Sequence, residues 1–276
     1  MEEMQNQEAP KMSSVETEQE EFEMSHTDKL VGVFSEPGTT FSKISKFPPK
    51  TSDWIIPVIV MIVVTILAQI VFMSNPAIKV ALQEKQMAAI EKRMNEAVAS
   101  GQMTQAQADE QTDRIREGMG QMGTIQLIGT IVGIPVVTFI FFFVTAGVFF
   151  LIVKFGLKGE GTYKDAMVAY GLPFYISVIQ WIVIVIISVA TSKAMASLSV
   201  AEFTGTEKST IAGFILGKLD IFSIWFYAVL GIGLAKMFKS ANTVKYIVAV
   251  FCVWIGFTLV FWLLGKAVPF LSFLAG

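Results

Sequence analysis

Five stretches of almost uninterrupted apolar residues alternate with polar segments along the chain. Each stretch is long enough to cross the hydrocarbon core of a bilayer, which takes about 20 helical residues at a rise of about 1.5 Å per residue. Backbone groups in lipid must be hydrogen-bonded internally, so we expect helices. The predicted spans are residues 54–73, 125–155, 167–190, 221–238 and 246–264. The pattern predicts an all-α, polytopic membrane protein with a bundle of five transmembrane helices.

The polar segment 74–123 separates the first two predicted spans. Its first half repeats apolar residues at helical spacing, from Val80 to Ala97, and Gly101 follows as a helix stop. Thr104 and Gln107 then have the spacing of a capping box, which marks the start of a second helix. We therefore expect an extramembrane helical hairpin, which either docks a partner or rests on the membrane or on the protein itself.

Residues 1–29 form a polar, acidic tail. Ten of the 23 acidic residues of the chain fall within residues 1–36, against two lysines. Such a segment buries too little apolar area to offset the entropy of ordering it, so we expect disorder. Residues 30–276 then make up the membrane domain. Just before the first span, Phe34, Phe41, Ile44 and Phe47 could rest at the headgroup boundary beside lysines that meet anionic lipid.

Lysine and arginine placement gives an orientation. The segment before the first span and the short connections 156–166 and 239–245 share one side of the membrane, and their lysines are denser than those of the opposite side. Cytoplasmic loops carry such an excess of basic residues. We expect an integral protein of the prokaryotic cytoplasmic membrane (an endomembrane in a eukaryote) with its N-terminus in the cytoplasm.

The sequence lacks the residues that a catalytic site would need. The single histidine, His26, lies in the acidic tail, where we expect a solvated bystander. The single cysteine, Cys252, lies in an apolar span, excludes an intrachain disulfide and is expected to be inert. We expect no catalytic residue, no metal site and no cofactor, and we classify the protein as non-enzymatic. Nothing in the sequence indicates a nucleic-acid partner.

The predicted spans contain few polar residues and no charged residue in their interiors. Gln69 and Gln180 are the most polar, and interhelical hydrogen bonds would account for them. Gly129 and Gly133 form a GxxxG step that allows close helix packing within the bundle or between protomers. Asp220 stands at the start of the fourth span, where the helix dipole favours a carboxylate.

Three sequence blocks, taken in order, carry a family resemblance. LVGVFSEPGTTFSKISKFPP precedes the first span, GEGTYKDAMVAYGLPFYI leads into the third, and DIFSIWFYAVLGIGLAKMFKSANTVK contains the fourth. Together with five spans, these blocks resemble the Yip (Ypt/Rab-interacting protein) family of membrane proteins over about residues 30–265. The positions that match the family pattern are Pro37, Phe41, Tyr170, Gly171, Pro173, Asp220, Trp225, Gly231 and Gly233.

One departure from the family limits what the resemblance implies. The eukaryotic branch carries a D-L-Y-G-P motif and binds Rab GTPases, whereas here Asp220 is followed by Ile-Phe-Ser. The chain therefore resembles the prokaryotic branch, and a Rab partner is not implied.

Two functions remain open. The first is a scaffold or adaptor that binds other membrane proteins, or a second copy of itself, or organises the bilayer. The alternative is a small-solute transporter or channel in which Pro57, Pro135 and Pro173 break helices around a path and Gln69 and Gln180 face each other across it.

Overall fold

The structure is a computed structural model that describes residues 23–121 and 123–267, with the side chains of 119–128 left out of the description. Within these ranges the chain forms helices and no strand. In chain order they are α1 (His26–Ser35), α2 (Pro37–Ile44), α3 (Ser52–Ser74), α4 (Pro76–Ala99), α5 (Gln105–Gln121), α6 (Gly123–Leu151), the π-helical turn η1 (Ile152–Gly156), α7 (Tyr163–Gly171), α8 (Phe174–Thr191), α9 (Val200–Thr204), α10 (Ile211–Lys218), α11 (Ile221–Met237) and α12 (Thr243–Ala267). The all-α membrane fold expected from the apolar pattern is confirmed.

Four helical segments are long and apolar enough to cross a membrane. They are Ser52–Ser74, Gly129–Gly156, Tyr163–Thr191 and Thr243–Ala267, and they overlap the first, second, third and fifth predicted spans. The third segment consists of α7 and α8, with Pro173 at the N-cap of α8. Pro57 and Pro135 lie inside α3 and α6, which continue through them.

The fourth predicted span, 221–238, differs from a simple crossing. Its helix, α11, has only 17 residues, and α10 precedes it at an angle of 62°. The two helices together are long and apolar enough for a broken span or a re-entrant loop. The bend has a local cause: Asp220 leaves helical geometry and accepts hydrogen bonds from the backbone N–H groups of Phe222 and Ser223, which starts a new helix.

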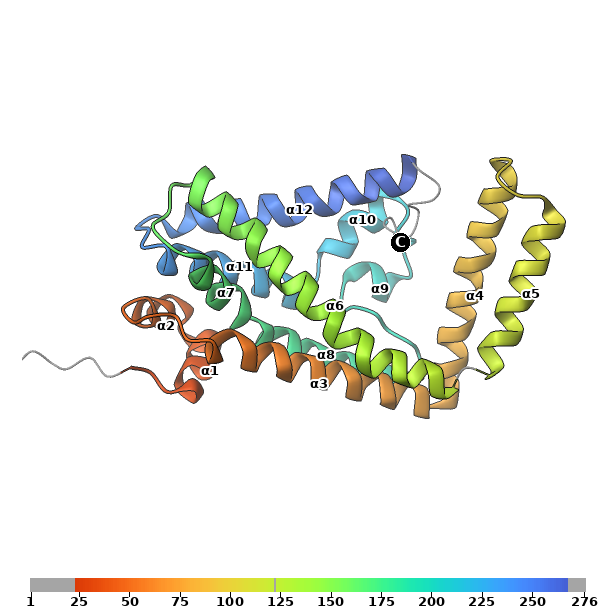
Figure 1. Cartoon of the computed structure of the whole chain (residues 1–276), viewed down its shortest axis with the longest axis horizontal. Helices are drawn as coiled ribbons and strands as arrows, with labels where there is room; N and C mark the ends of the chain where they lie inside the picture. Colours follow the sequence, from red (N-terminus) through yellow and green to blue (C-terminus); the bar gives the residue numbers. More distant parts are fainter. Residues whose placement is uncertain (1–22, 122, 268–276) are drawn as a thin grey trace, which may run out of the picture.

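The segments that were expected to share one membrane side meet at one end of the bundle (Figure 1). There the N–H of Glu160, in the loop between η1 and α7, donates to the carbonyl of Phe238 at the end of α11. The α1–α2 region lies at the same end. The hairpin α4–α5 and the loop that follows α8 lie at the opposite end, as does the end of α12.

The segment just before the first span packs on protein, which corrects the expectation that its apolar face rests on lipid. Phe41 is fully buried and Ile44 is 4% exposed, both in the main core cluster with α11. Phe34 packs edge-to-face on Trp225 with ring centroids 5.6 Å apart. Burial against α11 removes these side chains from both water and lipid.

The folded region also begins earlier than residue 30. Ser25 caps α1 by accepting a hydrogen bond from the N–H of Asp28, so residues 26–29 of the expected disordered tail are helical. Lys29 anchors this helix because it is only 3% exposed and is paired with Asp53 of α3. The remainder of that expectation, on residues 1–22, lies outside the described residues.

The hairpin matches its sequence signals. The side chains of Thr104 and Gln107 form the expected capping contacts at the start of α5. Gly101 turns the chain with φ +72°. Arg116 pairs with Glu91 across the two helices at 3.0 Å. Figure 1 shows α4 and α5 side by side at the end of the bundle, running across the direction of α3 rather than along it.

Candidate functional site

Three glycines at family-like positions let helices approach closely. A Cβ built on Gly233 would lie 2.9 Å from the ring of Phe41, and one on Gly171 would lie 2.6 Å from the Cα of Trp54. A Cβ on Gly231 would lie 2.6 Å from the Cα of Ile247. These distances are too short for real contacts, so each glycine is required for a helix contact: α2 on α11, α7 on α3, and α11 on α12. Pro37 starts α2 at a position where its missing N–H costs nothing.

Tyr170 stands in an aromatic cluster that joins α6, α7, α8 and α11. Its ring centroid lies 5.4 Å from that of Phe142, 5.2 Å from Phe174 and 5.8 Å from Phe226. Offset and edge-to-face aromatic pairs of this kind add to the stabilisation from burial. The family-like positions therefore hold the bundle together, and none of the described contacts places them around an open site.

A buried ion pair lies at the N-terminal end of the bundle. The ammonium group of Lys29 is 2.9 Å from both carboxylate oxygens of Asp53, and their side chains are 4% and 3% exposed. Glu23 lies 3.6 Å from Lys29 and 2.6 Å from the more exposed Lys50. The hydrogen bond from Lys50 lowers the pKa of Glu23. Two elements far apart in sequence, α1 and α3, are thus joined through charge.

His26 belongs to the same cluster, which corrects its expected role as a solvated bystander. Its Nε2 is hydrogen-bonded to the hydroxyl of Tyr175 on α8 at 2.6 Å. Its Nδ1 lies 3.9 Å from Asp53 and makes no hydrogen bond with the described residues. Burial lowers the pKa of His26, while the nearby Asp53 carboxylate acts in the opposite direction. We call Glu23, His26, Lys29, Lys50, Asp53 and Tyr175 the Asp53 cluster.

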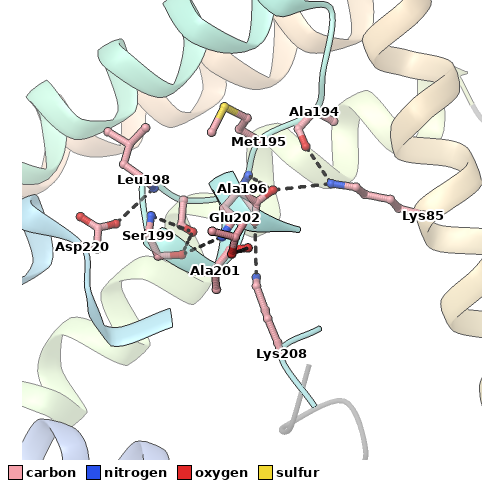
Figure 2. Close-up of polar contacts among 12 residues, drawn as sticks. Lys85, Ala194, Met195, Ala196, Leu198, Ser199, Ala201, Glu202, Lys208 and Asp220 are labelled. Atoms are coloured by element: carbon pink, nitrogen blue, oxygen red, sulfur yellow. Dashed lines mark hydrogen bonds and ion pairs between the residues drawn. The ribbon is translucent and has the colours of Figure 1, made fainter. Parts of the chain in front are cut away.

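A second polar network is centred on Asp220, at the N-cap of α11 (Figure 2). The carboxylate is 2% exposed. One oxygen accepts from the side chain of Gln180 at 2.8 Å and from the N–H of Leu198 at 3.2 Å, while the other caps α11. Asp220 therefore fastens α8, the loop after it and α11 at one point.

Glu202 on α9 connects the hairpin to this loop. Figure 2 shows Lys85 of α4 and Lys208 reaching Glu202 from two sides, at 3.6 and 3.9 Å. The ammonium group of Lys85 also donates to the carbonyl of Ala194 at 2.8 Å. Glu202 is only 12% exposed, whereas the side chains of Lys85 and Lys208 are 62% and 45% exposed. These contacts hold the base of the hairpin against the loop.

A comparison with known protein families identifies the family of this chain. The Yip1 domain matches residues 31–264, which is most of the chain. The chain belongs to the Yip1 family. No curated protein and no solved structure matches it. In this Yip1 domain the family-like glycines and Tyr170 lie in the packed contacts described above.

The polar and glycine positions expected to serve helix packing divide into two groups. Gln180 makes an interhelical hydrogen bond, to Asp220. Gln69 is half-buried on α3, and no hydrogen bond joins it to Gln180 in the described part of the Yip1 domain. No atom of the described residues lies within 4 Å of a Cβ built on Gly129 or Gly133. No described helix therefore approaches this step closely, and contact between protomers stays a prediction.

Three cavities of the Yip1 domain lie away from the family-like positions. Two lie along the hairpin, and the third, of about 300 Å³, lies between α10 and α12. Neither Gln69 nor Gln180 lines any of the three. Within residues 23–121 and 123–267, no group of three or more His, Cys, Asp or Glu side chains could hold a metal ion.

The Asp53 cluster is the part of the structure that sequence reasoning missed. A partial signal exists, because His26 and Lys29 are three residues apart and share one face of a helix. Asp53, a carboxylate directly before an apolar run, is a second signal. Lys29 and Asp53 are 24 residues apart in the sequence, and His26 and Tyr175 are 149 residues apart, so no local pattern connects the members of the cluster.

Proposed function

We propose that this Yip1-family protein is a non-enzymatic membrane scaffold that presents the α4–α5 hairpin to other membrane proteins. The observation that carries the proposal is the way the hairpin is attached. It is fixed to the bundle at its base, and its remaining length packs mainly on itself. A projecting arm with a rigid base suits contact with a partner.

The base of the hairpin is well anchored. Ile78 is fully buried in a cluster with Phe72, Ile184 and Ala194. Lys85 adds its contacts to Ala194 and Glu202. Beyond this point, the pair between Lys92 and Glu207 is exposed by 59% and 70%, so it contributes little stability.

The surface of the distal hairpin suits protein more than lipid. Glu91, Asp109, Asp113 and Arg116 line the polar cavity between α4 and α5. Charged side chains of both signs would be costly in the bilayer interior. They are suited to an aqueous surface, where complementary charges on a partner give specificity.

The proposal includes an orientation. The N-terminal end of the bundle carries short, lysine-dense connections, so it faces the cytoplasm of a prokaryotic cell. The hairpin then projects from the opposite side of the cytoplasmic membrane. Rab GTPases are not part of the proposal, because the motif associated with them in the family is absent. Cysteine accessibility at an exposed hairpin position in intact cells tests this orientation, and labelling only after lysis would contradict it.

Photo-crosslinking in native membranes tests the function. A photoreactive residue at Ala89 on α4 or Ala106 on α5 is exposed, whereas one at Ala108 is a matched control because that position is 2% exposed between the helices. We expect both exposed positions, and not Ala108, to capture the same membrane protein or a second copy of the chain. Capture of lipid alone, together with solute flux in liposomes, would favour the transporter and contradict the scaffold.

A shortened hairpin supplies the second arm of the test. Deletion of residues 89–112 removes the distal turns but keeps Ile78 and Lys85 at the base. We expect this variant to accumulate in the membrane and to lose the captured partner in co-purification. Retention of the same partner at the same yield would show that the hairpin is not the contact surface.

A further inference from the structure

The cavity between α10 and α12 lies outside the proposed scaffold surface and has its own chemistry. Its volume is about 300 Å³. Polar and cationic side chains line one part of it, and aromatic side chains line the other. The residues on which the inference depends are Ser197, Ser199, Lys208, Lys218, Phe261 and Trp262.

The two lysines give the cavity an excess of positive charge. In the described part of the chain, no carboxylate lies within 4.0 Å of the ammonium group of Lys218. That group instead lies over the rings of Phe214 and Trp254, at 5.1 and 5.5 Å from their centroids. Lys208 shares its nearest carboxylate, Glu202, with Lys85. Both lysines line the cavity and carry like charge, which a bound anion would balance.

Hydrogen-bond donors accompany this charge. The hydroxyl groups of Ser197 and Ser199 line the cavity and are hydrogen-bonded to each other at 2.9 Å, which leaves one hydroxyl hydrogen for a ligand. Trp262 donates from its indole N–H to the carbonyl of Lys208 at 3.0 Å, which holds the backbone of that lysine beside the cavity. Lys266 adds a third cation over the ring of Trp262, at 4.3 Å. Cations with hydroxyl donors are the groups that bind phosphate oxygens in proteins.

The position of the cavity favours an amphiphilic anion. Trp262 lies five residues before the end of α12, or about 8 Å along the helix axis, where tryptophan marks the membrane interface. Phe261, which lines the cavity, is 43% exposed, and Ile211 and Ile215 of the adjoining helix α10 are 68% and 55% exposed. Bilayer lipid covers exposed side chains of this kind, so the acyl chains of a phospholipid held at the cavity would lie beside them.

We propose that this cavity binds the phosphate group of an anionic phospholipid between Lys208 and Lys218, with the acyl chains along Ile211, Ile215 and Phe261. The site uses α10, the short helix of the broken span, and so gives that helix a role at the headgroup level. A free phosphate-type anion has the same headgroup chemistry and differs by lacking the chains. The inference does not depend on the scaffold function, because it involves neither α5 nor the distal part of α4.

Lipid retention by the purified full-length chain tests the site. Native mass spectrometry from neutral-detergent micelles doped with phosphatidylglycerol or phosphatidylcholine reports which lipid stays bound. We expect phosphatidylglycerol to be retained and phosphatidylcholine to be lost. Lys208→Gln and Lys218→Gln should each weaken retention about fivefold, as expected for one basic side chain near an anionic lipid. Lys79→Gln, at an exposed lysine on the same membrane side, should have no effect.

Two further measurements separate binding from folding and lipid from free anion. Lys218→Arg keeps the charge and should retain the lipid, and elution as a single species verifies that each variant is folded. Equal retention of phosphatidylglycerol by the wild type and the Lys208→Gln/Lys218→Gln variant would overturn the proposal. Lysine-dependent thermal stabilisation by inorganic phosphate in micelles without phosphatidylglycerol, with no lipid retained, would overturn the lipid assignment and give the site to a soluble anion.

Discussion

The ring of Phe41 on α2 occupies the space that a side chain on Gly233 of α11 would fill, with 2.9 Å between the ring and a Cβ built at that position. Both residues match the family pattern, although they lie on opposite sides of three predicted spans in the sequence. Their contact joins an aromatic residue that precedes the first span to a glycine in the fourth. It makes α2 part of the core.

The first prediction concerns this contact. Gly233→Ala should destabilise the protein by about 1–3 kcal/mol, because the buried ring has little room to move. Phe41→Ala should cost about 3–5 kcal/mol through the cavity it leaves. Gly133→Ala is the matched control, since a Cβ there meets no described atom within 4 Å. Unfolding by a denaturing detergent measures these effects, and equal stability of the Gly233→Ala and Gly133→Ala variants would contradict the prediction.

The second prediction concerns the pair formed by Lys29 and Asp53. Lys29→Met or Asp53→Leu alone leaves a buried charge without its partner, which should cost about 3–5 kcal/mol. The double variant removes both charges and should recover most of that loss. Lys50→Gln, at a side chain that is 55% exposed, serves as the control and should change stability by less than about 1 kcal/mol. Additive losses in the double variant would show that the two charges do not depend on each other.

The third prediction concerns pH. Burial places the pKa of His26 below its ordinary value of 6.5, so the unfolded chain takes up a proton at a higher pH than the folded chain does. The contribution of His26 to stability is therefore fully present above about pH 6.5, and it is lost as the pH drops from that value toward the pKa of His26 in the folded protein. Lys29 and Tyr175 also face the ring, and Asp53 partly offsets the effect of burial.

His26→Gln checks this dependence, because His26 is the single histidine of the chain. Detergent unfolding between about pH 5 and pH 8 should show a flatter stability profile for the variant than for the wild type. Glu23 titrates below its ordinary value of 4.5, because Lys50 lowers its pKa, so it contributes mainly at more acidic pH. Parallel profiles for the two proteins would remove His26 as the cause.

The fourth prediction concerns Asp220. Asp220→Ala removes the cap of α11, at about 1 kcal/mol, and leaves the amide of Gln180 and the N–H of Leu198 without their acceptor, at about 1–3 kcal/mol more. Asp220→Asn keeps one acceptor oxygen, so its stability should lie between that of Asp220→Ala and that of the wild type. Limited proteolysis of the loop after α8 measures the local effect. Unchanged cleavage in Asp220→Ala would show that the loop is held by other contacts.

Much of the fold was accessible from hydropathy, because lipid enforces long apolar helices. Four predicted spans overlap helical segments that are long enough to cross a membrane, and the turn signals around Gly101 and Thr104 located the hairpin correctly. The short helix α10 was missed, since its eight residues are too few to span the bilayer alone. The carboxylate of Asp220 was placed at a helix start, but its bonds to Gln180 and Leu198 are tertiary contacts without a local signal.

Two expectations concerned surfaces whose covering partner the sequence does not identify. The apolar face around Phe41 and Ile44 would have the same spacing whether it lay on lipid or on α11, so an amphipathic pattern did not identify what covers it. Likewise, the spacing of Gly129 and Gly133 permits close packing but does not supply a partner helix. The sequence alone identifies surfaces that must be covered, and the tertiary arrangement decides by what.

The joint between α3 and α4 has a mechanical consequence. Asn75 caps α4 directly after α3 ends, and Ile78 packs beside Phe72, so the two helices meet at a fixed corner. The 24 residues of α4 make a lever of about 36 Å, and a tilt of α3 by about 10° would sweep its tip through about 6 Å. The opposite end of α3 is held by Asp53 through Lys29. A load on the hairpin tip would therefore act along α3, toward the end of the bundle at which Lys29 pairs with Asp53.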